Sequence, residues 1–201
     1  MSILVGLTGN IGAGKTITAS YFNELGARII DADQISRRLV SPYQPAWKDI
    51  VEEFGSNYLN YDKTLNRSKL AFDVFRDDTK KNALENILHP RVIAEEKKIY
   101  LDHQKNNPKA IVLIDSPLLI ESKNFKNVDK VIIVQSTPEL QVQRVMKRDG
   151  ESSSSVEDRL NSQMSLEEKL KYADYILYNT SGLDHLKCQV KSLYTEIRNL
   201  A

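Results

Sequence analysis

Five short apolar runs mark the chain, and residues that favour turns or helix caps bound each of them. In chain order they read SILVGLT, ARII, AIVLID, KVIIVQ and DYILY, and they cover residues 2–8, 27–30, 110–115, 130–135 and 174–178. Continuous apolar runs of this length, rich in branched residues, are typical of parallel strands that are buried on both faces. Because helical patterns lie between the runs, the alternation predicts an α/β fold with right-handed crossovers between its strands.

Apolar stripes at helical spacing predict the helices between these strands. The first helix is expected within residues 14–26, where Ala19, Phe22 and Leu25 share a face and Gly26 provides the end. Residues 31–109 are more than one crossover needs, and they carry three further stripes. These stripes are Trp47, Ile50, Val51 and Phe54, ended by Gly55; Leu70 and Val74; and Leu84, Ile87 and Leu88, broken by Pro90. The pattern predicts an inserted helical subdomain.

Helix-start signals recur after the fourth apolar run. Ser136 has an acidic residue three positions later and the segment closes at Gly150, which predicts one helix. Ser155 and Ser165 repeat the same Ser-x-x-acid start and predict two more short helices. The serine-rich stretch GESSSS, residues 150–155, is expected to be a flexible hinge.

The stretch GNIGAGKT, residues 9–16, matches the phosphate-binding pattern G-x-x-x-x-G-K-[ST] at every fixed position. It follows a predicted strand and precedes a predicted helix, as such a loop requires. Its glycines let backbone amides point at phosphate oxygens, Lys15 would reach the β and γ phosphates, and the Thr16 hydroxyl would bind Mg²⁺. The residues expected to bind ATP here are Gly9, Asn10, Ile11, Gly12, Ala13, Gly14, Lys15, Thr16 and Ile17.

Two residues of this stretch are unusual for a phosphate loop. A loop this tight often has glycine at the Asn10 position, and we expect the asparagine to substitute by adopting a left-handed conformation. Ile17 carries no hydroxyl, but a contact from its backbone amide to the α phosphate needs none.

Charge and composition narrow the class of partner. Lys plus Arg number 28 against 27 for Asp plus Glu, so no bulk electrostatic field draws the chain to nucleic acid or to an anionic membrane. The longest apolar runs have the length of strands, and the initial MSILVGLTG has neither a basic leader nor a signal cleavage site. The single cysteine, Cys188, fits a reducing compartment, and we expect a thiol that packs within the fold. We therefore expect a cytoplasmic protein that binds neither nucleic acid nor membrane.

A phosphate loop alone does not distinguish a GTPase switch, an ATP-driven machine and a phosphoryl transferase. The chain has neither N-K-x-D, which reads guanine, nor D-x-x-G near a γ phosphate, nor an L-S-G-G-Q-like transporter signature. What remains is typical of a small-molecule kinase, with a nucleotide-binding regulatory module as the alternative from another class.

Arginines on two predicted helices form a candidate lid over about residues 139–171. Arg144 and Arg148 lie one turn apart on one face, and Arg159 shares a face with Gln163. Guanidinium groups from a closing lid stabilise the charge on equatorial phosphate oxygens and exclude water. Exposed arginines that are merely solvated are the alternative interpretation.

Acidic residues follow two predicted strands at the carboxyl edge of the sheet, where open α/β folds bind their ligands. Asp31 and Asp33, with Arg37, could take the proton of an alcohol and hold an anion. Asp33 could instead be the N-cap of the following helix. Asp115 ends the third strand, where it could hold Mg²⁺ through water or cap the next segment.

Six segments, in this order and spacing, resemble the dephospho-CoA kinase family over nearly the whole chain. They are GLTGNIGAGKT, DADQISR, HPRV, DSPLLIE, QVQRVMKRD and RLNSQMSLEEKLKYADYILYN. The resemblance implies transfer of the ATP γ-phosphoryl group to the ribose 3′-hydroxyl of dephospho-CoA, with Mg²⁺, in the cytoplasm, as the final step of coenzyme A biosynthesis. A kinase of another small alcohol or nucleotide remains the alternative.

The resemblance also implies a nucleoside-monophosphate-kinase-like fold with a five-stranded parallel sheet, a helical acceptor-binding insertion and a helical lid. The chain would form a single domain, 1–201, with its core at 1–40, 109–138 and 172–201, the insertion at about 41–108 and the lid at about 139–171. The oligomeric state is not predicted.

Carried over position by position, the resemblance implies roles for single residues. Catalysis would fall to Asp33, as the base on the acceptor hydroxyl, with Lys15 and Arg148; ATP would also be contacted by Arg144, Arg148 and Asn179, the last near adenine. The acceptor side would comprise Asp33, Arg37, His89, Leu118 and Arg159. Taken alone, a histidine here is more often a helix-end residue than a ligand, and the extended backbone that Pro90 favours at His89 leaves both roles open.

Overall fold

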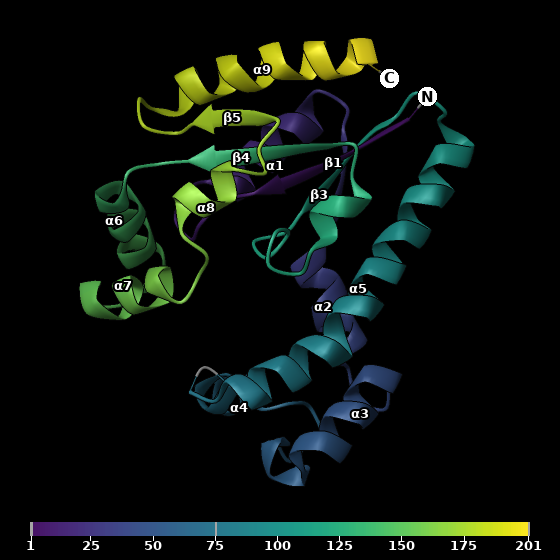
Figure 1. Cartoon of the computed structure of the whole chain (residues 1–201), viewed down its shortest axis with the longest axis vertical. Coiled ribbons are helices and arrows are strands. Elements are labelled where there is room, and N and C mark those ends of the chain that lie inside the picture. Colours follow the sequence, from purple (N-terminus) through teal and green to yellow (C-terminus); the bar gives the residue numbers. More distant parts are fainter. Residues whose placement is uncertain (1, 75, 201) are drawn as a thin grey trace. The chain divides into compact units, whose positions relative to one another are not determined.

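The computed structural model describes residues 2–74 and 76–200, and its centre is a five-stranded sheet (Figure 1). In chain order the strands are β1 (Ile3–Thr8), β2 (Arg28–Asp31), β3 (Ile111–Asp115), β4 (Lys130–Gln135) and β5 (Tyr175–Tyr178). The sheet order is β2-β3-β1-β4-β5; β1 pairs in parallel with β3 and β4, and β4 with β5. The predicted α/β fold and all five predicted strands are confirmed, with shifts of a single residue at their ends.

Two helices, α1 (Lys15–Glu24) and α9 (Leu183–Leu200), share an apolar core with the sheet. Leu7 and Leu113 of the central strands are fully buried, and they belong to one cluster with Phe22 of α1 and Ile197 of α9. Burying a large aliphatic or aromatic side chain stabilises a fold by about 1.5–3 kcal/mol. Because both β1 and α1 are anchored in this core, the segment that joins them is held at both ends.

The chain divides into two compact units, residues 2–30 with 100–200 and residues 31–99. The second unit holds α2 (Ala32–Leu39), α3 (Pro45–Phe54), the 3₁₀ helix η1 (Ser56–Tyr58), α4 (Arg67–Val74) and most of α5 (Asp78–Asn106). It has an apolar core of its own, to which Trp47, Ile50, Leu70 and Val74 belong. The predicted stripes on α3 and α4 are confirmed, and α3 ends at the expected Gly55.

Helix α5 contradicts the break that the sequence predicts at Pro90, because it runs from Asp78 to Asn106 with the proline inside. Proline removes one backbone donor and crowds the preceding turn, so carbonyls near it need other partners. In the same stretch the Arg91 side chain adds a hydrogen bond, since its Nη1 donates to the Ile87 carbonyl at 2.6 Å. His89 accordingly has a helical backbone, and the extended conformation expected for it is wrong.

Three helices, α6 (Pro138–Asp149), α7 (Ser153–Asn161) and α8 (Leu166–Leu170), fill the segment between β4 and β5. The N-cap of α6 is Thr137, which accepts from the Leu140 amide, and not the predicted Ser136. The reason is Pro138, whose fixed φ suits the first helical position and so makes the residue directly before it the cap.

The start of α7 also lies earlier than predicted. Ser152 is its N-cap and accepts from the Ser155 amide, so Ser155 is not the cap and the second half of the GESSSS stretch is helical rather than a hinge. Four successive serines offer several equivalent caps, and the acidic spacing alone selected the wrong one. The predicted Ser165 cap of α8 and the end of α6 at Gly150 are confirmed.

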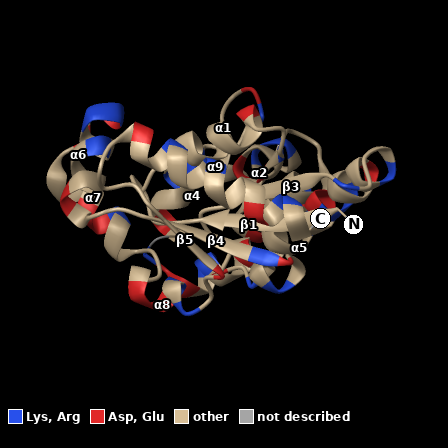
Figure 2. Cartoon of the chain, turned by 90° about the horizontal axis from the view of Figure 1, so that it is seen from above, with Lys and Arg blue, Asp and Glu red and all other residues tan. Residues whose placement is uncertain are grey.

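Figure 2 shows Lys and Arg scattered among Asp and Glu over the ribbon, in keeping with the net charge of +1. Cys188 lies in α9 with an exposed side chain, so the expectation of a packed thiol is wrong. The buried stripe of that helix is Leu186, Val190, Leu193 and Ile197, and position 188 falls off it. Over the described ranges, no helix has both the length and the apolar character needed to cross a membrane.

Candidate active site

The predicted phosphate loop lies between β1 and α1, as expected, and its backbone is turned at two glycines. Gly12 has a φ of 75° and Gly14, the N-cap of α1, a φ of 104°, a region that glycine enters without strain. Lys15 and Thr16 are the first two residues of α1. The loop therefore ends at a helix amino terminus, where unpaired amides and the helix dipole favour an anion.

A polar network braces this loop from behind, and its centre is Arg144 of α6. The Arg144 Nη1 atom donates to the Gly12 carbonyl at 3.3 Å and to Ser136 Oγ at 2.9 Å, and its Nη2 donates to the Asn179 carbonyl at 2.9 Å. Asn179 Nδ2 in turn donates to the Ala13 carbonyl at 2.9 Å. Two residues that the resemblance assigns to ATP thus hold carbonyls of the phosphate loop in this structure.

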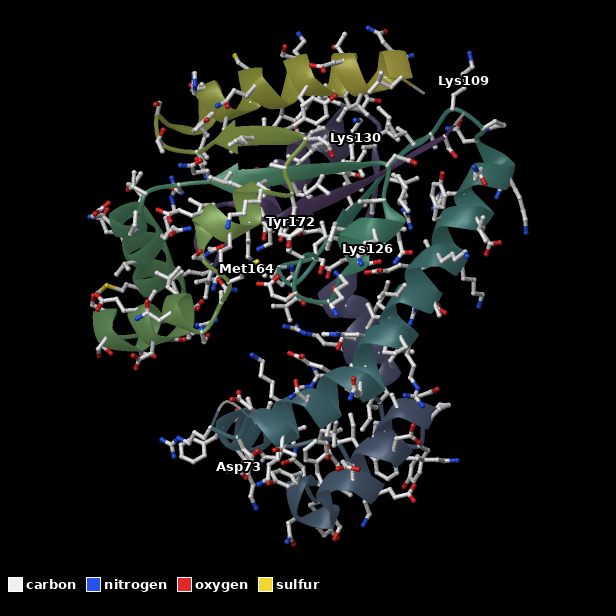
Figure 3. The ribbon with its side chains drawn as sticks, viewed as in Figure 1. Asp73, Lys109, Lys126, Lys130, Met164 and Tyr172 are labelled. Carbon is white, nitrogen blue, oxygen red and sulfur yellow. The ribbon has the colours of Figure 1, made fainter. Side chains whose placement is uncertain are left out.

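The linker between α7 and α8 contacts the start of the same loop. Gln163 Oε1 accepts from the Ile11 amide at 2.9 Å, and the carbonyl of Met164, labelled in Figure 3, accepts from Asn10 Nδ2 at 3.3 Å. Asn10 is not among the non-glycine residues with positive φ, so the left-handed conformation expected for it is wrong. Its contribution is a side-chain amide that reaches Met164, which glycine lacks.

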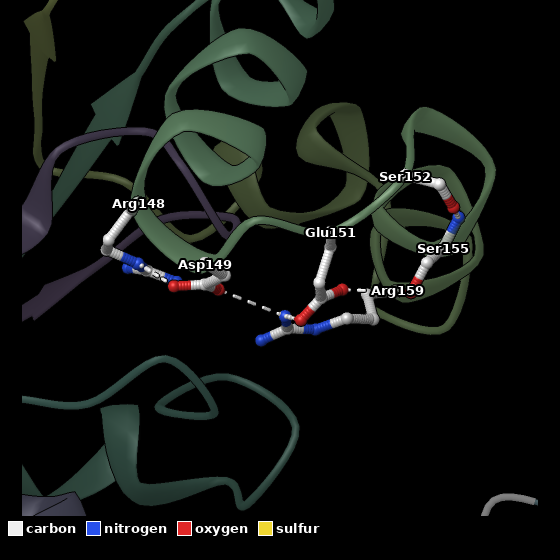
Figure 4. A network of polar contacts seen from close by, with 6 residues as sticks. All are labelled: Arg148, Asp149, Glu151, Ser152, Ser155 and Arg159. Carbon is white, nitrogen blue, oxygen red and sulfur yellow. Dashed lines mark hydrogen bonds and ion pairs between the residues drawn. The ribbon is translucent and has the colours of Figure 1, made fainter.

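The predicted lid arginines Arg148 and Arg159 meet on one carboxylate (Figure 4). Asp149 accepts from Arg148 Nε at 2.6 Å and Nη2 at 2.8 Å, and from Arg159 Nη1 at 3.3 Å. Glu151 accepts from Arg159 Nη1 at 2.7 Å. The hydrogen bond from Arg148, foremost, lowers the pKa of Asp149 to about 2, and it raises the pKa of Arg148. Because the two arginine side chains are 60% and 43% exposed, these are surface ion pairs that exchange readily.

In the unit of residues 31–99, α2 carries the predicted base. The N-cap of α2 is Asp31, whose Oδ1 accepts from the Gln34 amide at 2.8 Å, so the capping role considered for Asp33 is wrong. Asp33 lies in the first turn of α2 and is exposed, and Arg37 lies one turn later on the same helix. The carboxylate and the guanidinium therefore face the same side of α2.

The segment after β3 is fixed by a lysine that the sequence did not single out. The Pro117 carbonyl accepts from Thr8 Oγ1 at 3.3 Å and from Lys169 Nζ at 3.0 Å. The Lys169 side chain is fully buried and pairs with Glu121 at 2.9 Å. Charged groups are buried when they are paired, so this pair ties α8 to the segment that follows Asp115.

The structure brings some of the predicted site residues together and leaves others apart. Arg144 and Asn179 are hydrogen-bonded to the phosphate loop, and Arg148 and Arg159 share the Asp149 carboxylate. Asp33, Arg37 and His89 lie in the unit of residues 31–99, whereas Asp115 ends β3 and Leu118, which is 38% exposed, follows it. Asp149, Lys169 and Glu121 were missed from the sequence. The only signal for Asp149 was its position directly after Arg148, and a lone Lys or Glu on a polar helix gives no sign that it is buried.

Comparison with known proteins places the whole chain in one family. The family model described as dephospho-CoA kinase matches residues 3–185. The dephospho-CoA kinase of Gamma-proteobacterium EBAC31A08 is 37% identical over 98% of both chains, and that of Bacillus anthracis is 40% identical over 96% of both. A solved structure, the dephospho-CoA kinase from Campylobacter jejuni, has a TM-score of 0.73 and 30% identity, with 99% of this chain and 98% of that one covered. By sequence and by fold, the chain belongs to the dephospho-CoA kinase family.

Proposed function

We propose that the chain transfers the γ-phosphoryl group of ATP to the ribose 3′-hydroxyl of dephospho-CoA and so forms coenzyme A and ADP. The observation that carries the proposal is the phosphate loop between β1 and α1, which Arg144 and Asn179 brace, in a chain of this family. Loop amides, the start of α1 and Lys15 supply the positive potential that a triphosphate needs. The reaction itself demands mainly positioning and charge stabilisation.

Mg²⁺ is part of the proposal, with Thr16 and Asp115 as the residues that would hold it. Thr16 is an exposed hydroxyl in the first turn of α1, and Asp115 is a carboxylate at the end of β3. Oxygen donors of this kind fit the ion, which takes only one or two protein ligands when it is bound with nucleotide phosphates. When bound, Mg²⁺ neutralises charge on the β and γ phosphates.

Asp33 is the proposed general base. Since Asp31 caps α2, the Asp33 carboxylate does not serve as its N-cap, and it lies exposed in the first turn, where it would take a proton from the 3′-hydroxyl. Proton removal of this kind strengthens the attacking oxygen as the bond to the γ phosphorus forms. Arg37, one turn later, together with His89 and Leu118, is assigned to the acceptor.

Arg148 and Arg159 are proposed to contact the transferring phosphates or the acceptor from the lid. Arg148 uses its Nε and one Nη2 donor on Asp149, so three of its five N–H donors stay available to a ligand. An arginine at the developing charge stabilises the transition state and helps to exclude water.

The test is ADP release by the purified chain with ATP, Mg²⁺ and dephospho-CoA. We expect release that depends on dephospho-CoA, a product heavier by one phosphoryl group, and loss of turnover on chelation with EDTA. The 3′-deoxy analogue of the acceptor should not react, whereas the 2′-deoxy analogue should. A panel of other alcohols and nucleotides forms the comparison set, and faster turnover of any of them, or ADP release without an acceptor, contradicts the proposal. A cytoplasmic location belongs to the same proposal and rests on the family resemblance alone.

A further inference from the structure

Arginine pairing in the unit of residues 31–99 is uneven. Arg38 and Arg91 each form an ion pair with a carboxylate from another helix of that unit. Arg37, Arg67 and Arg76, in contrast, make no ion pair with any of the residues that the structure describes, and Arg76 stacks on the Phe72 ring instead. A guanidinium keeps its charge under all physiological conditions, so Arg37 and Arg67 have no counter-charge from an ion pair among these residues.

Arg37 and Arg67 also lie beside each other. The Arg67 Nη2 atom donates to the Arg37 carbonyl at 3.2 Å, which ties the first residue of α4 to the last turn of α2. Burial, and then repulsion by the charge of Arg37, lower the pKa of Arg67. Arg67 moreover begins α4, where the partial positive charge of the helix end disfavours a second cation and favours an anion. Two arginines and the start of α4 thus supply positive potential side by side, and Asp33 is the carboxylate on the same side of α2 as Arg37.

The position of this pair relative to Asp33 indicates which anion would fit. Asp33 and Arg37 are one turn apart on α2, about 6 Å along the helix axis. In a nucleotide, the 3′-hydroxyl and the 5′-phosphate are carried by the same ribose, a few bonds apart. A carboxylate and a guanidinium one helical turn apart therefore match the spacing between the hydroxyl that reacts and the phosphate at the other end of the sugar.

We propose that Arg37 and Arg67 form an anion site that binds the diphosphate on the 5′ side of the acceptor ribose. The inference rests on the proposed function, because it takes Asp33 as the group that meets the 3′-hydroxyl. Arg67 uses one of its five N–H donors in the hydrogen bond to the Arg37 carbonyl. The other donors suit the paired oxygens of a diphosphate. Arg67 thereby becomes a specificity-determining residue, since an acceptor without a 5′ diphosphate leaves the two cations unmatched.

The first test is steady-state kinetics of Arg67→Gln with each substrate varied in turn. We expect KM for dephospho-CoA to rise about tenfold to a hundredfold, the range for loss of a charge-assisted hydrogen bond, with little change in kcat or in KM for ATP. Arg67→Lys, which keeps the charge but loses the fork of donors, should fall between wild type and Arg67→Gln. Thermal unfolding of Arg67→Gln should fall only slightly below wild type, because the hydrogen bond to the Arg37 carbonyl that it removes lies at the surface.

Arg76→Gln is the matched control, since it removes a second exposed arginine from the same unit without touching the proposed site. Arg76 stacks over the Phe72 ring at 3.7 Å from its centroid. Its loss should leave KM for dephospho-CoA within about twofold of wild type, a free-energy change below 0.5 kcal/mol or so. An equal rise of KM in Arg76→Gln would assign the effect to the net charge of the unit and overturn the proposal.

Salt dependence provides a readout that a purely structural role does not change. Raising the ionic strength screens the attraction between a diphosphate and two exposed arginines, so KM for dephospho-CoA should rise with salt in wild type and rise less steeply in Arg67→Gln. If Arg67→Gln keeps the wild-type KM and salt slope while wild type turns over dephospho-CoA, the anion site is wrong and the proposed function stands. If wild type releases no ADP with dephospho-CoA, the proposed function fails first.

Discussion

At the scale of single residues, Asp31 and Asp33 separate a structural carboxylate from a proposed catalytic one. We expect Asp33→Asn to lower kcat by about a hundred- to ten-thousand-fold and to leave the Kd for ATP unchanged, because only the proton acceptor is lost. Asp31→Ala is the matched control: it removes the N-cap of α2 and should cost about 1 kcal/mol of unfolding free energy while kcat stays close to wild type. Stopped-flow or coupled turnover assays measure kcat, and nucleotide-binding titrations measure the Kd for ATP. Near-normal turnover of Asp33→Asn would contradict the role of base.

Asp149 offers a second residue-scale prediction, since it joins Arg148 and Arg159. Its pKa is lowered from 3.8 to about 2, chiefly by the hydrogen bond from Arg148. The ionised carboxylate therefore stabilises the folded segment around Asp149 fully above pH 3.8, and this stabilisation is lost as the pH falls through about 2. A carboxyl ¹³C titration from mildly acidic pH down to about pH 2 should give a midpoint near the lower value, and in Arg148→Ala the midpoint should return towards 3.8. An unchanged midpoint in the variant would mean that Arg148 does not hold Asp149 in solution.

At the scale of elements, the buried pair of Lys169 and Glu121 fixes α8 to the segment after β3. We expect Glu121→Gln to lower the free energy of unfolding by about 3–5 kcal/mol, because it leaves a fully buried ammonium without its counter-charge. The double variant Lys169→Met/Glu121→Leu should recover most of that loss, since an apolar pair of similar volume needs no desolvated charge. Urea unfolding with circular dichroism measures all three chains. A double variant as unstable as the single one would show that geometry, not charge pairing, sets the stability here.

The elements also mark what local patterns can and cannot reveal. The strands and the phosphate loop were predictable because apolar runs and glycine spacing act within a few residues. The continuation of α5 through Pro90 was not, because the local rule marks proline as a helix breaker, whereas α5 packs Leu84, Ile87 and Leu88 against the core of its unit. The buried state of Lys169 was not either, since it depends on Glu121, far away in sequence. Local sequence patterns thus predict helices and strands, whereas contacts between side chains of different elements become known only from the structure.

At the scale of the whole molecule, the residues proposed for ATP and those proposed for the acceptor lie in different compact units. The phosphate loop, its brace and the lid arginines lie in the unit of residues 2–30 with 100–200, while Asp33, Arg37 and Arg67 lie in the unit of residues 31–99. The apolar stripes predict a helical insertion at about 41–108, and the second compact unit, residues 31–99, also takes in α2 with Asp33 and Arg37. ATP and acceptor are therefore expected to stabilise different units.

Hydrogen exchange of backbone amides tests this partition directly. We expect Mg²⁺ and ATP, at about a hundred times the Kd of ATP, to slow amide exchange in the phosphate loop and in residues 139–163 by about a hundredfold. The reason is that a ligand which binds only the locally folded state stabilises that state against opening by RT ln(1 + [L]/Kd). Dephospho-CoA at about a hundred times its own Kd should slow exchange in α2 and at the start of α4 instead. Arg67→Gln, at the same concentration of dephospho-CoA, should lose most of this second protection and keep the first. Protection of α2 by ATP alone, equal to that by dephospho-CoA, would contradict the assignment of the two substrates to the two units.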